Sequence, residues 1–268
     1  MLLYHGTSAA FLDEIKQKGI LPRRISKGRD NWKHTVSSNK DAVYLTTAYA
    51  WHFASHASND KKGLILEIDR DLLPDYFRLC PDEDFLEQAT RKQVGPNFAP
   101  LDWSMKKRTL YYRKNAISNP LMADKSLEHM GTAAYYGTIP WSAVTRYAVV
   151  DWQKNKWAWF RASDSMVSMM NYRILQDRHK AFTRWFFNDP VTAHELSGEG
   201  EYQYDKLDDD IRKFVEQQEE RMKQLEAAMA DRTGIEVVDL RKQLGNHVSV
   251  KDVIAFEKAD PAKAGCTC

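Results

Sequence analysis

Cysteine is scarce in this chain, and long apolar runs are missing. Three of the 268 residues are cysteine, which is too few for a disulfide-stapled scaffold, so a reducing compartment is expected. No stretch reaches the roughly 20 apolar residues that a membrane-spanning helix needs. The first residues also lack the basic region and apolar run of a secretory signal. The sequence therefore predicts a soluble, cytoplasmic protein.

A large excess of charge of one sign is also missing. Lysine and arginine number 39 against 37 aspartate and glutamate, which gives a formal net charge of +2. A polycation built for nucleic acid is excluded, although a local basic patch is not. Hydrophobic residues make up 43% and charged residues 28% of the chain, an ordinary globular balance. The length fits one large domain or one domain with an appendage.

Strands and helices alternate over the first 151 residues, and the pattern then becomes helical. A first strand is expected to end at a His-Gly-Thr turn, and Thr7 or Ser8 can cap a helix that Gly19 ends. The further expected strands cover residues 42–45, 63–68, 133–137 and 147–150, and a short helix covers 48–57. Longer helical patterns cover 156–187 and 205–231. We therefore predict a domain over 1–151, a mainly helical extension over 152–256 and a disordered tail over 257–268.

Two short motifs in the first fifty residues carry the most chemical information. Tyr4-His5-Gly6-Thr7-Ser8 follows the first apolar residues, and Val43-Tyr44-Leu45-Thr46 comes about forty residues later. A histidine can donate a hydrogen bond to a sugar hydroxyl, a glycine allows close backbone approach, and a tyrosine offers a stacking face. Between the two motifs stands Gly19-Ile20-Leu21-Pro22.

These motifs resemble the ADP-ribosyltransferase superfamily in its histidine–tyrosine–glutamate branch, which includes the poly-ADP-ribose polymerases and the rifampicin ADP-ribosyltransferases. The stretch from Leu3 to Ser8 is similar to the first-strand histidine motif, and Val43 to Thr46 to the second-strand tyrosine motif. The resemblance implies an α+β fold with a split β-sheet core, formed by two small antiparallel sheets around a central cleft. An α-helical C-terminal extension would follow, and NAD would be the cosubstrate.

By the same resemblance, His5 would bind ribose and Tyr44 would stack on nicotinamide. The implied cofactor-binding residues are His5, Gly6, Thr7, Tyr44, Leu45 and Thr46. The implied catalytic positions are His5, Tyr44 and Ala133, the last at a place where the family has a glutamate. No metal is expected.

The segment from Tyr136 to Val144 resembles the one that follows the catalytic-glutamate strand, particularly in DNA-modifying toxins. The family glutamate lies seven or eight residues before the proline, where this chain has Ala133 and Thr132 before Pro140. Glu128 comes too early to replace it without a change of strand register. Ala133 could be an engineered replacement, the chain could use another acid or none, or it could be an inactive binder; the first two are favoured.

The acceptor of the ADP-ribose is expected to be a macromolecule. The segments 22–41 and 103–114 combine basic and aromatic residues, a mixture that suits single-stranded nucleic acid. RNA or DNA is therefore favoured over protein or a small molecule. By analogy with the family, we expect a toxin or phage-defence effector, which an antitoxin protein could inhibit.

Three other functions remain open. A protein-directed ADP-ribosyltransferase would differ only in its acceptor. An RNA 2′-phosphotransferase would need a basic cluster, for which Arg23, Arg24 and Arg29 are candidates. An inactive NAD-site binding protein would use the amphipathic helix 205–231 as its partner surface.

Several acidic, histidine and cysteine residues invite a metal-site interpretation that we do not favour. His52 and His56 are one helical turn apart but lack a third ligand. Asp82-Glu83-Asp84 is most simply a solvated acidic loop, and Cys266-x-Cys268 lacks a second pair of ligands.

Overall fold

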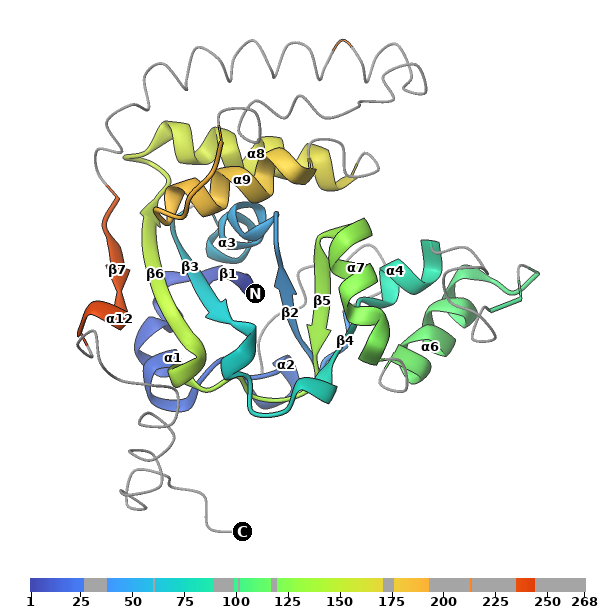
Figure 1. Cartoon of the computed structure of the whole chain (residues 1–268). Helices are drawn as coiled ribbons and strands as arrows, with labels where there is room; N and C mark the ends of the chain where they lie inside the picture. The colour runs from blue at the N-terminus through green and yellow to red at the C-terminus, as the bar shows by residue number, and fades with distance from the viewer. Residues whose placement is uncertain are drawn as a thin grey trace, which may run out of the picture.

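A computed structural model describes residues 1–26, 38–59, 61–88, 99–100, 102–116, 120–170, 176–192, 213 and 235–243. Within these ranges, seven antiparallel strands form one open sheet in the order β4-β5-β2-β1-β3-β6-β7 (Figure 1). The strands are β1 (Leu2–Ser8), β2 (Val43–Thr46), β3 (Lys62–Asp69), β4 (Leu79–Pro81), β5 (Thr132–Tyr135), β6 (Val144–Asp151) and β7 (Val237–Asp239). The predicted α+β class is confirmed.

The helices gather in two groups. One group, α3, α8 and α9, lies beside β1 and β3, while α4, α6 and α7 lie at the β4–β5 end (Figure 1). The α-helices are α1 (Leu12–Lys18), α2 (Arg23–Ser26), α3 (Ala50–Ser58), α4 (Glu83–Gln88), α6 (Met105–Ala116), α7 (Ala123–Met130), α8 (Lys156–Met170), α9 (Gln176–Phe186) and α12 (Leu240–Gln243). Short 3₁₀ turns cover Ala9–Phe11, Arg70–Leu72, Tyr76–Arg78, Pro120–Met122 and Trp141–Ala143.

The ladder between β1 and β2 is the shortest in the sheet. Their ladder has a single registered pair, Tyr4 opposite Thr46, whereas β1 pairs with β3 along its whole length. The expected pair of separate sheets is therefore corrected to one sheet, whose two halves are joined at this point. Beyond this pair β1 and β2 form no ladder, so their backbone N–H and C=O groups there can form hydrogen bonds with other partners.

The first strand is longer than the sequence predicted. Strand β1 runs through His5, Gly6 and Thr7 to Ser8, and every residue from Leu2 to Ser8 has a partner on β3. The expected turn at His-Gly-Thr is therefore wrong, because pairing with β3 keeps these residues extended. The helix signals are confirmed: the Ser8 hydroxyl accepts from the Ala10 amide, and Gly19 follows α1 with a φ of 78°.

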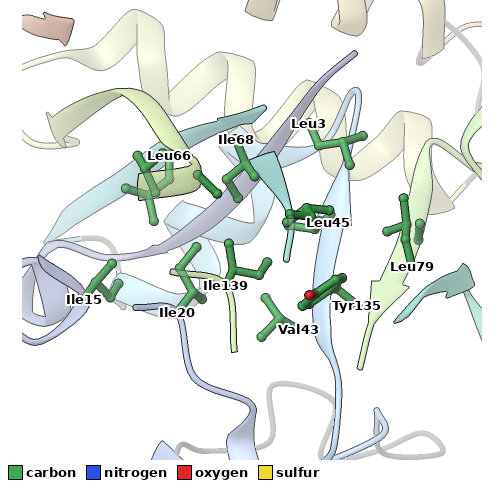
Figure 2. Packing of buried hydrophobic residues seen from close by; sticks show 14 of the residues in the cluster. Leu3, Ile15, Ile20, Val43, Leu45, Leu66, Ile68, Leu79, Tyr135 and Ile139 are labelled. Atoms are coloured by element: carbon green, nitrogen blue, oxygen red, sulfur yellow. The ribbon is translucent and has the colours of Figure 1, made fainter. Parts of the chain in front are cut away.

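An apolar cluster fills one face of the sheet beneath the junction. Leu3 of β1 and alternate residues of β2 and β3 point into it, together with Ile15 of α1 and Ile139 (Figure 2). Side chains of α7 and of residues 143–144 complete the cluster. Its fully buried members include Leu3, Leu45, Leu64, Leu66, Ile68, Leu79, Ala133 and Ile139. Burial of this apolar area supplies much of the driving force for folding. Tyr44, between Val43 and Leu45, necessarily points to the opposite face.

A second apolar cluster joins the first 151 residues to the segment after them. Tyr4 and Trp51 pack with Ala158, Phe182 and Phe186 of α8 and α9. The helical pattern predicted over 156–187 is found as α8 and α9, with residues 171–175 outside the described ranges. The helix predicted over 205–231, apart from Lys213, and the tail 257–268 also lie outside them. The described part of the extension therefore shares one core with the sheet.

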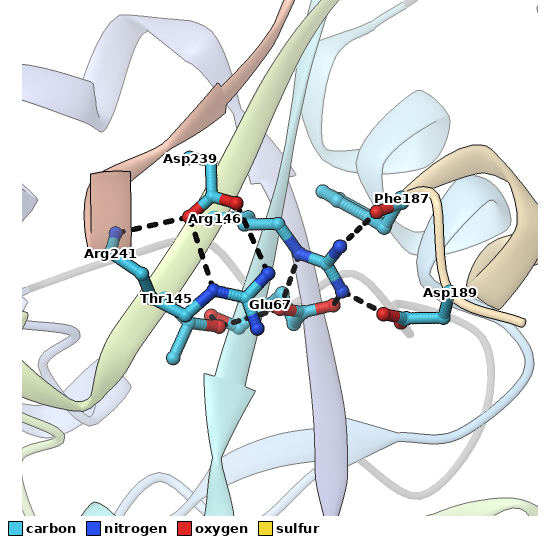
Figure 3. A network of polar contacts seen from close by, with 7 residues as sticks. All are labelled: Glu67, Thr145, Arg146, Phe187, Asp189, Asp239 and Arg241. Carbon is cyan, nitrogen blue, oxygen red and sulfur yellow. Dashed lines mark hydrogen bonds and ion pairs between the residues drawn. The ribbon is translucent and has the colours of Figure 1, made fainter. Parts of the chain in front are cut away.

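A buried ion network fastens the chain after α9 to the sheet (Figure 3). The Glu67 carboxylate is fully buried and accepts hydrogen bonds from Arg146 Nε at 2.7 Å and from the Thr145 hydroxyl at 2.6 Å. Arg146 also donates to the Phe187 carbonyl and to Asp189 Oδ2, the latter at 2.6 Å. Two arginines face three carboxylates, and Arg146 bridges Glu67 and Asp189, so the network ties the segment after α9 to the sheet.

Candidate active site at the β1–β2 junction

The motifs that carried the family resemblance meet in space. Ile20 and Ile139 form an antiparallel bridge, with the Ile20 amide 2.7 Å from the Ile139 carbonyl and the reverse pair at 3.0 Å. A side chain on Gly19 would come within 2.4 Å of the Ile139 carbonyl oxygen. The Gly-Ile-Leu-Pro and Thr-Ile-Pro stretches therefore have a joint structural role, which holds α1 against the segment that leads into β6.

His5 contacts the backbone of Tyr44, while a pocket shared by their two side chains stays a prediction. His5 Nδ1 lies 2.9 Å from the backbone carbonyl oxygen of Tyr44, across the gap where β1 and β2 separate. A carbonyl oxygen only accepts, so the ring proton must be on Nδ1. Burial lowers the pKa of His5, against a smaller opposing effect of this hydrogen bond. The ring is therefore neutral at pH 7, and its Nε2 is an acceptor.

This tautomer corrects one expected role. The sequence predicted that His5 donates a hydrogen bond to a ribose hydroxyl. With Nδ1 already donating to Tyr44, the neutral ring can only accept at Nε2, so the sugar hydroxyl would be the donor.

Gly6 is required by the packing of α3. A Cβ on Gly6 would stand 2.1 Å from the Ala50 carbonyl oxygen and 2.6 Å from the Ala54 amide nitrogen. Both atoms belong to the helix backbone, which cannot move aside alone. The close approach expected at this glycine is therefore made by α3, and this contact accounts for the residue type without a ligand.

Three other predicted cofactor contacts have different surroundings. Leu45 is fully buried in the apolar cluster. The Thr46 hydroxyl is buried, donates to the Gly131 carbonyl at 2.6 Å and accepts from the amides of Ala48 and Tyr49. Both side chains are thus occupied inside the protein, and the Thr46 hydroxyl holds the turn from β2 into α3. Thr7, by contrast, is only partly buried on β1.

The Tyr44 phenol ends in a polar cluster that the sequence did not predict. Its hydroxyl donates to Glu83 Oε1 at 2.6 Å and accepts from the Asn39 amide at 2.7 Å. Arg113 Nε donates to the same Glu83 oxygen at 3.2 Å. Burial, followed by the charges of Glu83 and Asp82, raises the pKa of Tyr44 well above its usual value. The phenol therefore stays protonated and acts as a donor to the carboxylate.

The same cluster includes Tyr136, from the third motif of the resemblance. Asn39 Nδ2 donates to the Tyr136 hydroxyl at 3.3 Å. Burial, then the charge of Glu83, raises the pKa of Tyr136. Two tyrosines from separate motifs thus lie on either side of Asn39 with their hydroxyls protonated.

Asp82 contributes a second buried carboxyl next to Glu83. Burial, then the charges of Asp84 and Glu83, raises the pKa of Asp82 well above its usual value. Arg113 stands beside Glu83. Arg113 thus offers charge compensation at Glu83, while burial favours the neutral form of Asp82.

Ala133 lies away from the Tyr44 side chain. It is fully buried in the apolar cluster and stands opposite Leu45 on β2 and Pro81 on β4. Residues opposite each other in a ladder share a face, so Ala133 points to the Leu45 face and the Tyr44 neighbour is Ala134. A glutamate at 133 would enter the apolar cluster. Glu128 is exposed on α7.

The basic segment between 105 and 116 is helix α6. Its exposed cations are Lys106, Lys107 and Lys114. The Lys107 ammonium stands 3.7 Å from the centroid of the Trp103 ring, and Trp103 packs edge-on against Tyr111. This face therefore combines positive charge with two partly buried aromatic rings.

Two expected members of that segment are engaged elsewhere. Tyr112 is buried, and its hydroxyl accepts from the Ala99 amide. Arg113 turns inward to Glu83. Neither is available as part of an exposed surface.

The basic cluster expected for an RNA 2′-phosphotransferase has most of its described members in other contacts. Arg24 forms an ion pair with Asp41, and Arg23 donates to the Ser38 carbonyl, while Arg29 lies outside the described residues.

Within the described ranges, no group of three or more histidine, cysteine or acidic residues is placed to hold a metal ion. His52 and His56 stand with ring centroids 5.9 Å apart. The described helices include none long and apolar enough to cross a membrane.

Glu83 is the principal residue that sequence reasoning missed. It lies in a run of three acids, which favours a solvated loop, yet Asp82 and Glu83 are 7% and 3% exposed. The one signal in the sequence was the apolar stretch Phe85-Leu86 that follows, because it predicts a short helix packed against the protein.

Comparisons with protein-family models, with curated proteins and with solved structures gave no match. Function is therefore inferred from the residues and their geometry.

Proposed function

We propose that this protein is an ADP-ribosyltransferase, which transfers ADP-ribose from NAD to a macromolecule, most favourably single-stranded RNA or DNA. The nicotinamide riboside end of NAD would bind at the β1–β2 junction. His5 Nε2 would accept a hydrogen bond from a ribose hydroxyl, and the Tyr44 ring would stack on the pyridinium.

The observation that carries the proposal is the line of contacts His5–Tyr44–Glu83. One hydrogen bond of 2.9 Å ties the imidazole to the backbone carbonyl of Tyr44, 39 residues away in the chain, and another of 2.6 Å ties the Tyr44 phenol to Glu83. By strand alternation the imidazole lies on the Leu66 face of β1, and the Tyr44 ring with the Glu83 carboxylate lies on the other face of β2, so the proposed site is the gap between the two strands. Breaking a glycosidic bond to a good leaving group depends mainly on such positioning and on electrostatic stabilisation.

The proposed reaction needs no redox partner. The bond between ribose C1′ and the pyridinium nitrogen breaks, and its electron pair stays on nitrogen, so that nicotinamide leaves neutral. A hydroxyl or amine of the acceptor forms the new bond to C1′ and releases its proton to the solvent. Positive charge develops at C1′ in between, which a nearby carboxylate stabilises.

A nucleic-acid acceptor is favoured by the exposed face of α6. Lys106, Lys107 and Lys114 offer charge to phosphates, and Trp103 and Tyr111 offer aromatic faces at which bases can stack. The same helix carries Arg113, whose ion pair with Glu83 connects this face to the candidate NAD site. A toxin or phage-defence role and control by an antitoxin remain predictions.

The direct experiment incubates the protein with NAD labelled on the adenylate part, together with separated RNA, DNA and protein fractions. The proposal predicts nicotinamide release and transfer of label to nucleic acid. Label on protein would instead indicate the protein-directed alternative, and ADP-ribose 1″,2″-cyclic phosphate would indicate the RNA 2′-phosphotransferase. NAD binding without nicotinamide release in any fraction would indicate an inactive binder.

The α6 face can be tested separately by its salt dependence. Each phosphate of a single strand that a protein neutralises contributes about 0.7 to the slope of log K against log salt. Replacing Lys106, Lys107 and Lys114 with alanine should therefore reduce the slope by about 2. Alanine at Lys61 and Lys62, exposed at the start of β3, is the matched control and should leave it unchanged. Equal slopes for both variants would exclude α6 as the acceptor surface.

A further inference from the structure

Glu83 is a buried carboxylate whose hydrogen bonds are unevenly shared between its two oxygens. Oε1 accepts from the Tyr44 hydroxyl at 2.6 Å and from the Asn39 amide and Arg113 Nε at 3.2 Å each. Oε2 is buried and has no hydrogen-bond partner in the described part of the chain. The side chain is only 4% exposed.

A bare carboxylate oxygen in a protein interior is costly. An unsatisfied buried acceptor loses about 1–3 kcal/mol, and a charged one loses more. Native proteins therefore rarely keep such an atom without a reason, such as a bound water or a ligand. Three donors bond to Oε1 and fix the orientation of the carboxylate. The position of Oε2 is therefore fixed as well, and it can accept one further hydrogen bond.

The donor must match the chemistry of the locality. An ionised carboxylate only accepts hydrogen bonds, and a sugar hydroxyl is a neutral donor of suitable size. Arg113 balances the charge of Glu83 on one side, while a positive charge developing on a sugar carbon would be stabilised on the other.

We propose that Glu83 is the carboxylate of the NAD site, with Oε1 holding the Tyr44 phenol and Oε2 accepting a hydrogen bond from a hydroxyl of the nicotinamide-side ribose. This inference rests on the proposed function and adds the identity of its acid. The acid comes from the start of α4, after β4, and not from position 133 on β5. Glu83 thereby binds the substrate directly and also positions Tyr44.

The test compares Glu83→Gln with Glu128→Gln in the full chain. Glutamine keeps the size of the side chain but removes the charge, and Glu128 is an exposed acid on α7 whose side chain lies outside the polar cluster. NAD affinity is measured by calorimetric titration, and kcat and KM by nicotinamide release. The proposal predicts at least a tenfold loss of kcat/KM in Glu83→Gln, mostly in kcat, and wild-type values in Glu128→Gln.

A second pair of variants separates direct binding from support of Tyr44. In a Tyr44→Phe background the phenol can no longer donate to Glu83, while the ring remains. If Glu83 acted only through that hydrogen bond, adding Glu83→Gln would change nothing further. The proposal instead predicts a further loss of NAD affinity of several-fold. Glu83→Asp, which retains the charge, should recover part of the activity.

The possible outcomes are distinct. A wild-type chain that neither binds NAD nor releases nicotinamide overturns the proposed function and this inference together. A wild-type chain that turns over NAD, with Glu83→Gln equally active, overturns the role of Glu83 alone. If urea unfolding shows that neither Glu83→Gln nor Glu83→Asp folds, Glu83 is a structural residue and the inference is likewise overturned.

Discussion

His5 and Tyr44 are joined by a hydrogen bond from the imidazole Nδ1 to the Tyr44 carbonyl oxygen, at 2.9 Å, across the point where β1 and β2 separate. This bond sets the tautomer of the histidine and makes Nε2 an acceptor. It also links the strand that carries the imidazole to the strand whose phenol contacts Glu83. The junction of the two strands, not either motif by itself, is therefore the unit on which the proposed function depends.

Gly6→Ala should destabilise the protein even without ligand. The new methyl group would stand 2.1 Å from the Ala50 carbonyl oxygen and 2.6 Å from the Ala54 amide, both in the backbone of α3. Overpacking of this kind costs about 1–3 kcal/mol or more, visible as a lower midpoint in urea unfolding. Gly137→Ala is the control, because its nearest contact is the flexible Arg78 side chain. Equal stability of the two variants would contradict the packing account of Gly6.

Ala133→Glu should lower stability and give no gain in nicotinamide release. The carboxylate would enter an apolar cluster with Leu45 opposite. Such burial costs at least about 2 kcal/mol through lost hydration and overpacking. Thermal unfolding and a nicotinamide assay on the same preparation check both parts. Increased nicotinamide release in this variant would show that position 133 belongs to the active site.

Arg146→Ala should be among the most destabilising single changes in the described part of the chain. It would leave the buried Glu67 charge without its ion pair and release Asp189, at a cost of about 3–5 kcal/mol. Arg241→Ala breaks a partly exposed ion pair with Asp239 and should cost about 0–1 kcal/mol. Urea denaturation at pH 7 measures both values. Similar small losses would show that the network in Figure 3 does not hold the segment after α9.

Stability should fall on acidification because of His52. Burial, and to a lesser extent His56, lowers the pKa of His52 from 6.5 to about 4. The unfolded chain therefore binds more protons, so stability is full above pH 6.5 and decreases as the pH falls toward 4. A shift of this size corresponds to about 3 kcal/mol. In His52→Gln the decrease between pH 6.5 and 4 should be smaller, and an unchanged pH profile would contradict the assignment.

The parts of the fold that follow from local pattern were predicted from the sequence. Apolar runs and alternation identified β2, β3 and β6, and the Gly19 stop signal matched the end of α1. The extent of β1 was missed because His-Gly-Thr has the composition of a turn, and only pairing with β3 shows that it is extended. The short strand β4 gave no clear signal, since its neighbours in the sheet come from distant parts of the chain.

The candidate site was likewise predicted only in part from the sequence. The proximity of His5 and Tyr44 could be predicted from their motifs, but the tautomer could not, since it depends on a backbone carbonyl 39 residues away. Glu83 was overlooked because three consecutive acids are typical of a solvated loop. Its partner Arg113 is 30 residues away in the chain, and no local pattern links the two. The environment of Ala133 required the register of β5 against β2, where a shift of one residue changes the face.

Calorimetric titration of NAD tests the central claim most directly, with the unmodified chain, His5→Ala, Tyr44→Ala and the surface control Lys61→Ala. The shared site predicts that the unmodified chain and the control bind NAD alike. It also predicts that each of the other two variants loses at least tenfold in affinity, about 1.4 kcal/mol. Equal affinity in all four proteins, or no binding by the unmodified chain, would contradict a dinucleotide site at the junction of β1 and β2.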